Sequence, residues 1–457
     1  MTTSDSNPKR KMTEWQITID DFSAQMLSFL QVSETLIPET TQRRKSEIIE
    51  FMELHQHLLS EDDFAEFERA IKWFGGSIGE WIDYVSGNGQ QKQTSKEGSG
   101  DRTGGAGKKS FSFRSANASK AFGQVIFDSL MGIKADPHED MLRKSLLVSA
   151  VSTFEVLFGR IAERVYRANK SALNDSEYKF SLQELAEFTT VDDAREFLAE
   201  KRISALMRGS VDSWGNWLGK AVKGASMEGL PIDWPSTREV FARRNLVVHN
   251  GGVVNHTYLS IVGALGGNRD EVELGTKLKI DKDYFAEGVQ RLLALGVLLS
   301  ADVAGKLHKR EVEELHPTLF RLSDIAVRRK AWSAAEAISA YLLNGKLNRG
   351  KHLRAQLLNW TARKGKHGPD EIRKEVEEWD VSGLSEDFSH CKEVLIGDKG
   401  AAVDVIEDLL AREKLTLIEL ATNPIYAEIA SEVPSMSRVK NLSLESASSP
   451  DRPELGK

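Results

Sequence analysis

The stretch from Glu139 to about Ala168 does most to limit how this chain can fold. Apolar residues recur along it at helical spacing and cover several faces of the predicted helix, which is typical of the central helix of a bundle. These residues are Leu142, Leu146, Leu147, Ala150, Val151, Phe154, Leu157, Phe158 and Ile161. Other segments show the same period, and the one candidate for strands is a short hairpin at 253–254 and 278–280. The sequence therefore predicts an all-α fold.

Composition divides the chain into segments. Residues 87–110 contain no apolar residue larger than alanine, so they are predicted to form a flexible linker. At 457 residues the chain is too long for one compact core. The predicted organisation is an N-terminal helical segment (1–86), the linker (87–110), a helical bundle (111–308), a helical-hairpin array (309–432) and a disordered tail (433–457).

Apolar spacing also predicts the individual helices. In the N-terminal segment, a helix that begins near Ile17 is expected to be separate from a second one over 41–59, and a third contains Phe64 and Phe67. Further helices are expected over 115–133, 181–202, 210–223 and 281–308 of the bundle, and over 332–342, 353–360 and 371–379 of the array.

The last part of the array is similar to a tetratricopeptide-type helical hairpin. The stretch 391–410 has a short Gly397-Asp398 turn between two helical patterns, and 418–424 resembles the cap after such arrays. There is no clean self-repeat of about 34 residues, so the resemblance stays an analogy. Because helical arrays mostly present surfaces to other proteins, a protein partner or trigger is expected to bind there.

The net charge, the cysteine count and the lack of long apolar runs exclude several classes of protein. The net charge of −7 argues against a general nucleic-acid coat protein, although it allows an enzyme that meets RNA through one local patch. The single cysteine, Cys391, excludes an internal disulfide framework and a cysteine-based zinc site. Neither a signal peptide nor an apolar run of membrane-spanning length is evident, so the sequence predicts a cytoplasmic protein without a membrane contact.

A polar cluster marks the end of one predicted helix. Ser236 is expected to be its N-cap and to form a capping box with Glu239, and Gly251-Gly252 is expected to end it. On this helix Asn245 and His249 share a face, because they are four residues apart. Arg244 flanks that face, since it is about 140° around the helix from His249.

Arg244, Asn245 and His249 match the Arg-Asn-x-x-x-His signature of the HEPN superfamily (higher eukaryotes and prokaryotes nucleotide-binding), which this chain resembles over roughly 115–305. The stretch 146–155 is similar to the long first helix of those all-α domains, with Glu155 at its acidic position. Downstream, Tyr258-Leu259, the stretch 275–281 and the apolar helix 285–299 look like the family's closing elements.

The resemblance implies an endoribonuclease of the toxin or antiviral-defence kind. It needs neither metal nor cofactor, and two copies of the motif face each other across a homodimer. His249 would act as general base or acid, Arg244 would stabilise the transition state and Asn245 would orient the ring or contact the sugar-phosphate. Glu155, Arg243 and Asn250 are supporting candidates.

The same residues also allow interpretations in which they have no catalytic role. His249 and the glycines after it also fit a simple C-cap, and Glu155 also fits a carboxylate that merely has an arginine or backbone partner. Metal binding by His249 and His256 is a weak further option, since no carboxylate lies at ligand spacing. A non-catalytic HEPN-like dimerisation or scaffold module, binding a nucleotide or a partner protein, is the alternative function.

The most basic stretch of the chain lies in the array, between Lys346 and His367. It suggests an RNA or phosphate contact through Lys351, Arg354, Arg363 and Lys364, with Trp360 as a stacking platform. A solvated helix face gives the same pattern and is favoured here.

Overall fold

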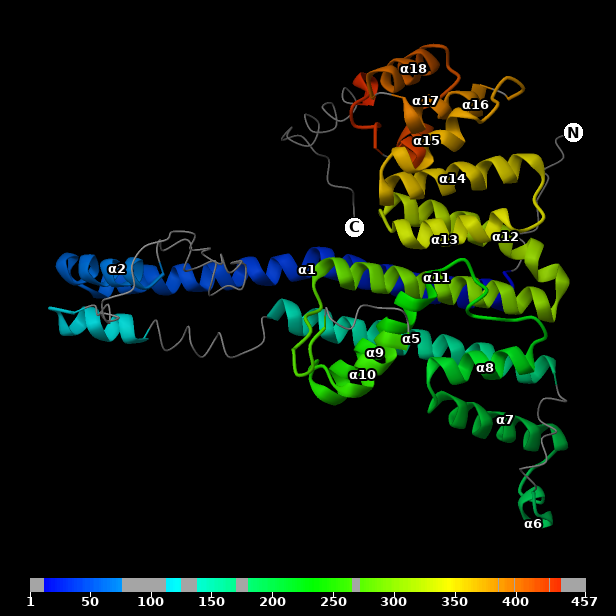
Figure 1. Cartoon of the computed structure of the whole chain (residues 1–457), viewed down its shortest axis with the longest axis horizontal. Coiled ribbons are helices and arrows are strands. Elements are labelled where there is room, and N and C mark those ends of the chain that lie inside the picture. The colour runs from blue at the N-terminus through cyan, green and yellow to red at the C-terminus, as the bar shows by residue number, and fades with distance from the viewer. Residues whose placement is uncertain are drawn as a thin grey trace, which may run out of the picture. The chain divides into compact units, whose positions relative to one another are not determined.

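The computed structural model describes residues 12–75, 112–124, 138–169, 180–264, 272–384, 386–397, 399–426 and 428–436. Helices make up nearly all of the regular structure in these ranges (Figure 1), and the β-pairing recorded there is one antiparallel bridge between Val253 and Lys277. The predicted all-α fold is therefore confirmed. The predicted linker at 87–110 lies outside the described residues, as does most of the predicted tail.

The helices have the following bounds: α1 Glu14–Leu58, α2 Glu61–Gly75, α5 His138–Ala168, α6 Leu182–Leu185, α7 Val191–Met207, α8 Val211–Ala221, α9 Trp234–Asn250, α10 His256–Ala264, α11 Lys282–Leu307, α12 Lys309–Arg328, α13 Trp332–Leu343, α14 Arg349–His367, α15 Asp370–Glu377, α16 Glu386–Ser389, α17 Cys391–Ile396, α18 Lys399–Ala411 and α19 Leu417–Thr422, followed by the short 3-10 helix η3 Pro424–Tyr426. Residues 116–124 are also helical, and the rest of the helix predicted over 115–133 lies outside the described ranges.

Contacts divide the chain into two compact units. The first contains Met1–Ser28, Leu147–Leu278 and Asp283–Lys457, and the second contains Phe29–Leu146 and Lys279–Lys282. All residues of the predicted site belong to the first unit. In the second unit, the Glu66 carboxylate on α2 accepts hydrogen bonds from the backbone amides of Arg114 and Ser115 at 2.7 and 2.8 Å.

Helix α11 forms the centre of the first unit. Its side chains are buried on every face from Val289 to Ala304, apart from short gaps. Next to it, an aromatic cluster joins α5, α8 and α9: the Phe154 ring lies 5.4 Å from that of Phe241, and the Phe158 ring stacks on Trp214 at 5.1 Å. The predicted central helix at 139–168 therefore packs its apolar faces as expected, and α9 rests on it.

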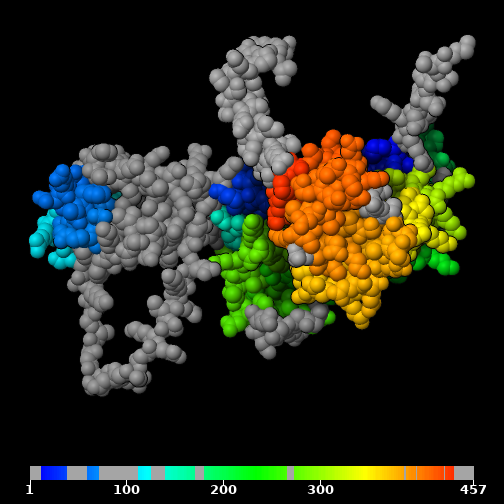
Figure 2. Space-filling model, turned by 90° about the horizontal axis from the view of Figure 1, so that it is seen from above, coloured from blue at the N-terminus to red at the C-terminus, as the bar shows by residue number. Residues whose placement is uncertain are grey.

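The C-terminal array continues from α11. Helices α12, α13 and α14 pack on one another in antiparallel layers (Figure 1), and α15 to α19 extend the stack. Two small cores hold this extension: one contains Trp360, Ile372 and Cys391, and the other contains Ile406 and Tyr426. On the face seen in Figure 2 the array, coloured yellow to red, forms one continuous surface.

Two boundary predictions were wrong, and one helix was not predicted. The two helices expected in the N-terminal segment before 60 are one helix, α1, which continues through Pro38 although an interior proline removes one backbone hydrogen bond. The helix expected over 181–202 is two, because Thr190 caps a new start with Asp193 in a capping box. Helix α12, with Pro317 inside it, was not predicted.

Two helices, Glu139–Ala168 and Lys282–Leu307, are long and apolar enough to cross a membrane on length and composition alone. No apolar run of that length was predicted from the sequence. In α11 (Lys282–Leu307), 83% of the most apolar window is buried inside the protein, as expected for the core helix of a bundle.

The close packing of Phe22 and Leu157 against Gly296 of α11 gives a test of the fold. A Cβ at Gly296 of α11 would lie 2.2 Å from Cε1 of Phe22 and 2.8 Å from Cδ2 of Leu157, so Gly296→Ala is expected to lower the free energy of unfolding by about 1–3 kcal/mol. Gly159→Ala on α5 is the control, because its Cβ would meet nothing within 4 Å and alanine favours the helix. Urea unfolding measures both. Equal stability of the two variants would contradict the packing.

Candidate functional site

Helix α9 carries the polar cluster, and its ends are well defined. Its N-cap is Asp233, whose Oδ1 accepts the backbone N–H of Ser236 at 3.2 Å. The predicted N-cap at Ser236 was therefore wrong, because Asp233 and Pro235 start the helix earlier. The predicted end is confirmed: Gly251 is the C-cap with φ 60°, and the Gly252 amide donates to the Leu246 carbonyl at 3.1 Å.

Burial of one face of α9 decides which residues point outward. Val240, Phe241 and Leu246 are buried, and the Phe241 ring belongs to the aromatic cluster with Phe154. In the last turns of the helix, the side chains of Asn245 and His249 are both exposed. The helix therefore presents its polar groups to solvent while its apolar residues fix its position.

Arg244 is held by two neighbours. Its Nη2 donates to Glu155 Oε2 of α5 at 2.9 Å, and its Nη1 donates to Asn245 Oδ1 at 2.9 Å. Both partners of the ion pair are partly exposed, at 19% for the Arg244 side chain and 27% for Glu155. Burial raises the pKa of Glu155, and the Arg244 guanidinium opposes that rise. The structure thus brings together three predicted site residues and orients the guanidinium at the surface.

His249 stands apart from this group. It lies one turn beyond Asn245, is exposed, and takes part in no hydrogen bond or ion pair recorded among the described residues. Next to it, the side-chain amide of Asn250 donates to the Val253 carbonyl, so Asn250 fastens the turn after α9. The His249 imidazole is therefore accessible to a ligand. The Asn250 side chain has a structural role, because it binds the backbone of the turn.

Arg243 points into a different cluster, with Glu239, Tyr258 and Tyr284. Its Nε donates to Glu239 Oε1 at 2.7 Å, Nη2 donates to the Tyr258 hydroxyl at 3.2 Å, and the guanidinium lies 3.8 Å from the centre of the Tyr284 ring. The Tyr284 hydroxyl donates to Glu239 Oε2 at 2.6 Å. We name these four residues the Glu239 cluster. It joins α9 to α10 and α11, so Arg243 positions the helix.

Sequence reasoning missed Glu239, Tyr258 and Tyr284 as partners of Arg243. The spacing of Glu239 and Arg243, four residues apart on a helix, was the available signal for one of the contacts. The two tyrosines come from other elements, and no local pattern connects them to α9.

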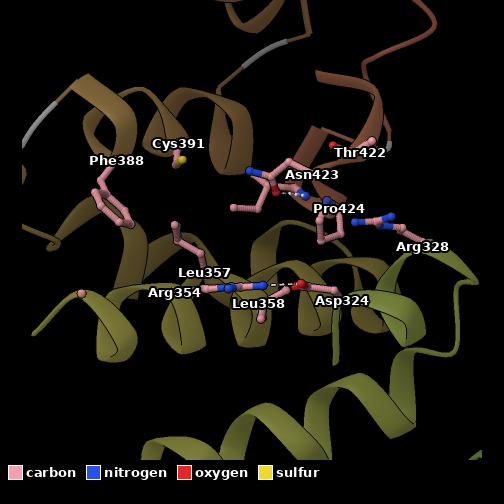
Figure 3. Close-up of a pocket in the computed structure, with 12 residues that line it drawn as sticks. Asp324, Arg328, Arg354, Leu357, Leu358, Phe388, Cys391, Thr422, Asn423 and Pro424 are labelled. Atoms are coloured by element: carbon pink, nitrogen blue, oxygen red, sulfur yellow. Dashed lines mark hydrogen bonds and ion pairs between the residues drawn. The ribbon is translucent and has the colours of Figure 1, made fainter. Parts of the chain in front are cut away.

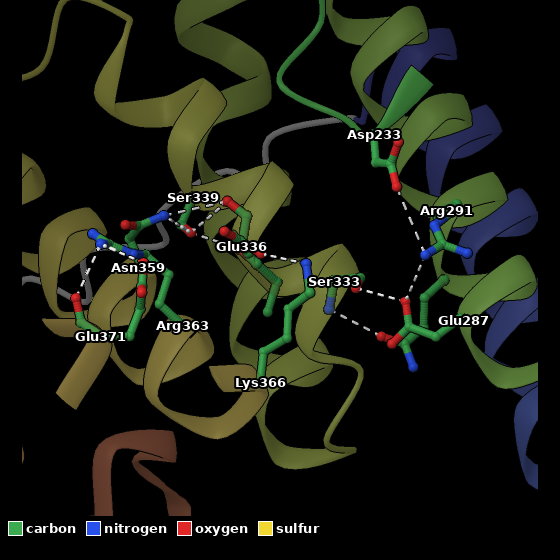
Figure 4. A network of polar contacts seen from close by, with 12 residues as sticks. Asp233, Glu287, Arg291, Ser333, Glu336, Ser339, Asn359, Arg363, Lys366 and Glu371 are labelled. Atoms are coloured by element: carbon green, nitrogen blue, oxygen red, sulfur yellow. Dashed lines mark hydrogen bonds and ion pairs between the residues drawn. The ribbon is translucent and has the colours of Figure 1, made fainter. Parts of the chain in front are cut away.

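Most cations of the predicted basic surface have carboxylate partners. Arg354 pairs with Asp324, Arg363 with Glu371 and Glu375, and Lys364 with Glu428. Figure 4 shows Arg363 beside Glu371, and Lys366 reaching Glu336. Of the four predicted RNA-binding residues, Lys351 alone has no ion pair recorded within the described ranges. The surface is therefore largely neutralised.

Trp360 is not a stacking platform. Its side chain is only 4% exposed and packs edge-on against Trp379, while its Nε1 donates to Glu375 at 2.9 Å. The prediction that bases stack on this ring was wrong, because the indole belongs to the core between α14 and α15.

The described ranges offer no metal site. No group of three or more His, Cys, Asp or Glu residues there is arranged to hold a metal ion, and His249 and His256 belong to no such group.

Comparisons of the chain with models of known families, with curated proteins and with solved structures found no match.

Proposed function

We propose that this protein is a HEPN-type endoribonuclease that cleaves RNA without a metal ion and leaves a 2′,3′-cyclic phosphate. The observation that carries the proposal is the Arg244–Glu155 ion pair at 2.9 Å, which fixes a guanidinium at the surface on the turns that also carry the exposed His249. Two of the signature residues, Asn245 and His249, are exposed, and the Arg244 side chain is 19% exposed.

Arg244 is suited to the phosphoryl group. Charge builds on the non-bridging oxygens when the 2′-oxygen attacks phosphorus, and a guanidinium can donate two parallel hydrogen bonds to them. Glu155 and Asn245 restrict the rotation of the side chain before the substrate arrives. This arrangement lowers the cost of positioning the cation in the transition state.

His249 is suited to proton transfer, because imidazole exchanges protons near neutral pH. As a base it removes the proton of the 2′-hydroxyl; the new O2′–P bond forms and the P–O5′ bond breaks. As an acid it gives a proton to the leaving 5′-oxygen. Asn245, one turn before it, would contact the sugar-phosphate through its side-chain N–H groups, since its Oδ1 accepts from Arg244.

A homodimer would supply two copies of these groups to one cleft. Exposed apolar side chains flank the polar group: Val156, next to Glu155, is 59% exposed, and Val248, next to His249, is 49% exposed. Apolar side chains beside a polar cluster suit a subunit contact. We further propose that the enzyme acts in the cytoplasm as a toxin or antiviral-defence effector, with a protein partner or trigger bound to the C-terminal array.

One observation favours the alternative function. The charge of Arg244 is already balanced by Glu155, which is also what a structural ion pair between α5 and α9 requires. On that interpretation the domain is a non-catalytic dimerisation or scaffold module that binds a nucleotide or a partner protein.

Incubation of the purified protein with total RNA in excess EDTA separates the two functions. The enzyme is expected to produce fragments with 2′,3′-cyclic phosphate ends, and a protein with both Arg244→Ala and His249→Ala, purified in parallel, is expected to produce none. No cleavage by the wild type together with a stable dimer in solution supports the scaffold. Equal cleavage by both preparations indicates a contaminant and contradicts the proposed site.

A further inference from the structure

The C-terminal array contains a solvent-open cavity of about 520 Å³ that the proposed ribonuclease site does not use. Helices α12 and α14 form one side of it, and α16, α17, the end of α19 and η3 form the other. Its volume lies within the range of small-molecule sites, about 300–1,000 Å³. The cavity therefore has room for one small organic ligand.

The two ends of this cavity differ in chemistry. Figure 3 shows Phe388 at one end of the pocket and Arg328 with Asn423 at the other; the Arg354 guanidinium lies between them and is directed toward Asp324. Asn423 holds its own loop, since its Oδ1 accepts the Ile425 amide at 3.2 Å. A ligand that fills the cavity has to carry an anionic group at one end and an apolar group at the other.

Arg354 is fixed in place before any ligand binds. Its Nη2 donates to Asp324, and its guanidinium lies 5.1 Å from the centre of the Phe320 ring. Even so, 53% of its side chain is exposed. The contacts recorded for this guanidinium use one terminal nitrogen, so its other N–H groups remain for a ligand at the cavity.

Arg328 adds a second cation near Asp324, because it follows that residue by four positions on α12, and it lies at the end of the pocket away from Phe388. It is the last residue of α12, it is exposed, and no ion pair is recorded for it within the described ranges. Together with Arg354 it gives two guanidiniums against the single carboxylate of Asp324. This end of the cavity carries a net positive charge, which favours an anion.

We propose that the cavity binds an organic phosphate joined to a planar ring, the chemistry of a nucleoside monophosphate. A phosphate monoester has three oxygens and a charge of about −1.5 to −2, so both arginines can donate to it while Arg354 keeps its bond to Asp324. A carboxylate offers two oxygens and one charge. The ring lies against Phe388 and Leu357, and the Asn423 amide is placed to donate to a polar edge of the ligand.

This site is independent of RNA cleavage, and calorimetry with AMP tests it directly. AMP is expected to bind the full-length protein at one site, and Arg328→Ala and Arg354→Lys are each expected to weaken it by about tenfold or more, since each loses charge-assisted hydrogen bonds. Arg354→Lys keeps the charge and removes the planar fork. Adenosine and inorganic phosphate, each lacking one half of the ligand, are expected to bind far more weakly.

Two matched variants identify the site. Arg373→Ala, on an exposed arginine of α15 that does not line the cavity, is expected to bind AMP like the wild type. Arg244→Ala is expected to do so as well, which separates this cavity from the proposed active site. Thermal unfolding without ligand checks that each variant is folded. Absence of AMP binding, binding unchanged in folded Arg328→Ala and Arg354→Lys, or binding lost in Arg244→Ala would each overturn the proposal.

Discussion

Replacement of His249 by alanine is expected to lower the rate of RNA cleavage by about 10²–10⁴-fold, the usual contribution of a general acid or base. Stability should hardly change, because the side chain is exposed at the end of α9 and has no recorded contact within the described residues. Initial rates on a short RNA oligonucleotide, measured in EDTA beside urea unfolding, give both quantities.

His256→Ala is the matched control for this variant. His256 is also exposed and begins the next helix, α10, so its loss is expected to leave the rate unchanged within about twofold. Arg244→Ala is expected to lower the rate by about 10²–10³-fold, as for loss of a group that stabilises transition-state charge. A His249→Ala rate close to that of the wild type would show that another group transfers the proton, and the proposed mechanism would be wrong.

The sequence predicted those features of the site that depend on residues close together in the chain, such as the ends of helices and their apolar faces. Gly251 was expected to end α9 because a left-handed residue was needed there, and its φ of 60° confirms it. The stretch from Glu139 was expected to be a central helix, and α5 indeed packs on α8 and α9 through Phe154 and Phe158. The pairing of Val253 with Lys277 lies close to the predicted hairpin.

Features that depend on distant residues were not predictable in this way. Glu155 had two interpretations in the sequence, and only the folded chain shows that its partner is Arg244, 89 positions away. Trp360 sits in a basic stretch, yet Trp379 and Ile372 cover it once α14 and α15 pack together. A charge pattern along one helix does not reveal which carboxylates another helix brings to it.

Replacement of Glu239 by alanine is expected to lower the free energy of unfolding by about 3 kcal/mol, near the lower end of the cost of breaking a buried ion pair, because this pair is largely but not fully buried. The side chains of Glu239 and Arg243 are each only 17% exposed. Burial and the Glu239 carboxylate raise the pKa of Tyr258 and Tyr284, so both hydroxyls stay protonated and donate. Without Glu239, the guanidinium of Arg243 and both hydroxyls lose their common acceptor.

A second glutamate–arginine pair with the same spacing provides the control. Glu163 and Arg167 on α5 are also four residues apart and 2.7 Å apart, but their side chains are 45% and 62% exposed. Glu163→Ala is therefore expected to cost no more than about 0.5 kcal/mol. Urea unfolding at neutral pH compares the two variants, and similar losses would contradict a special role for burial at Glu239.

The Glu239 cluster also connects stability to the proposed activity. It ties α9 to α10 and α11 through Glu239 and through Arg243, the residue directly before Arg244, so it fixes the rotation at which Arg244 meets Glu155. Tyr284→Phe removes one of its hydrogen bonds at a cost of about 1 kcal/mol and should leave the protein folded. Because a small shift of a positioned group reduces rate strongly, this variant is expected to cleave RNA more slowly while it remains fully folded. A wild-type rate in Tyr284→Phe would mean that the cluster supports the fold alone.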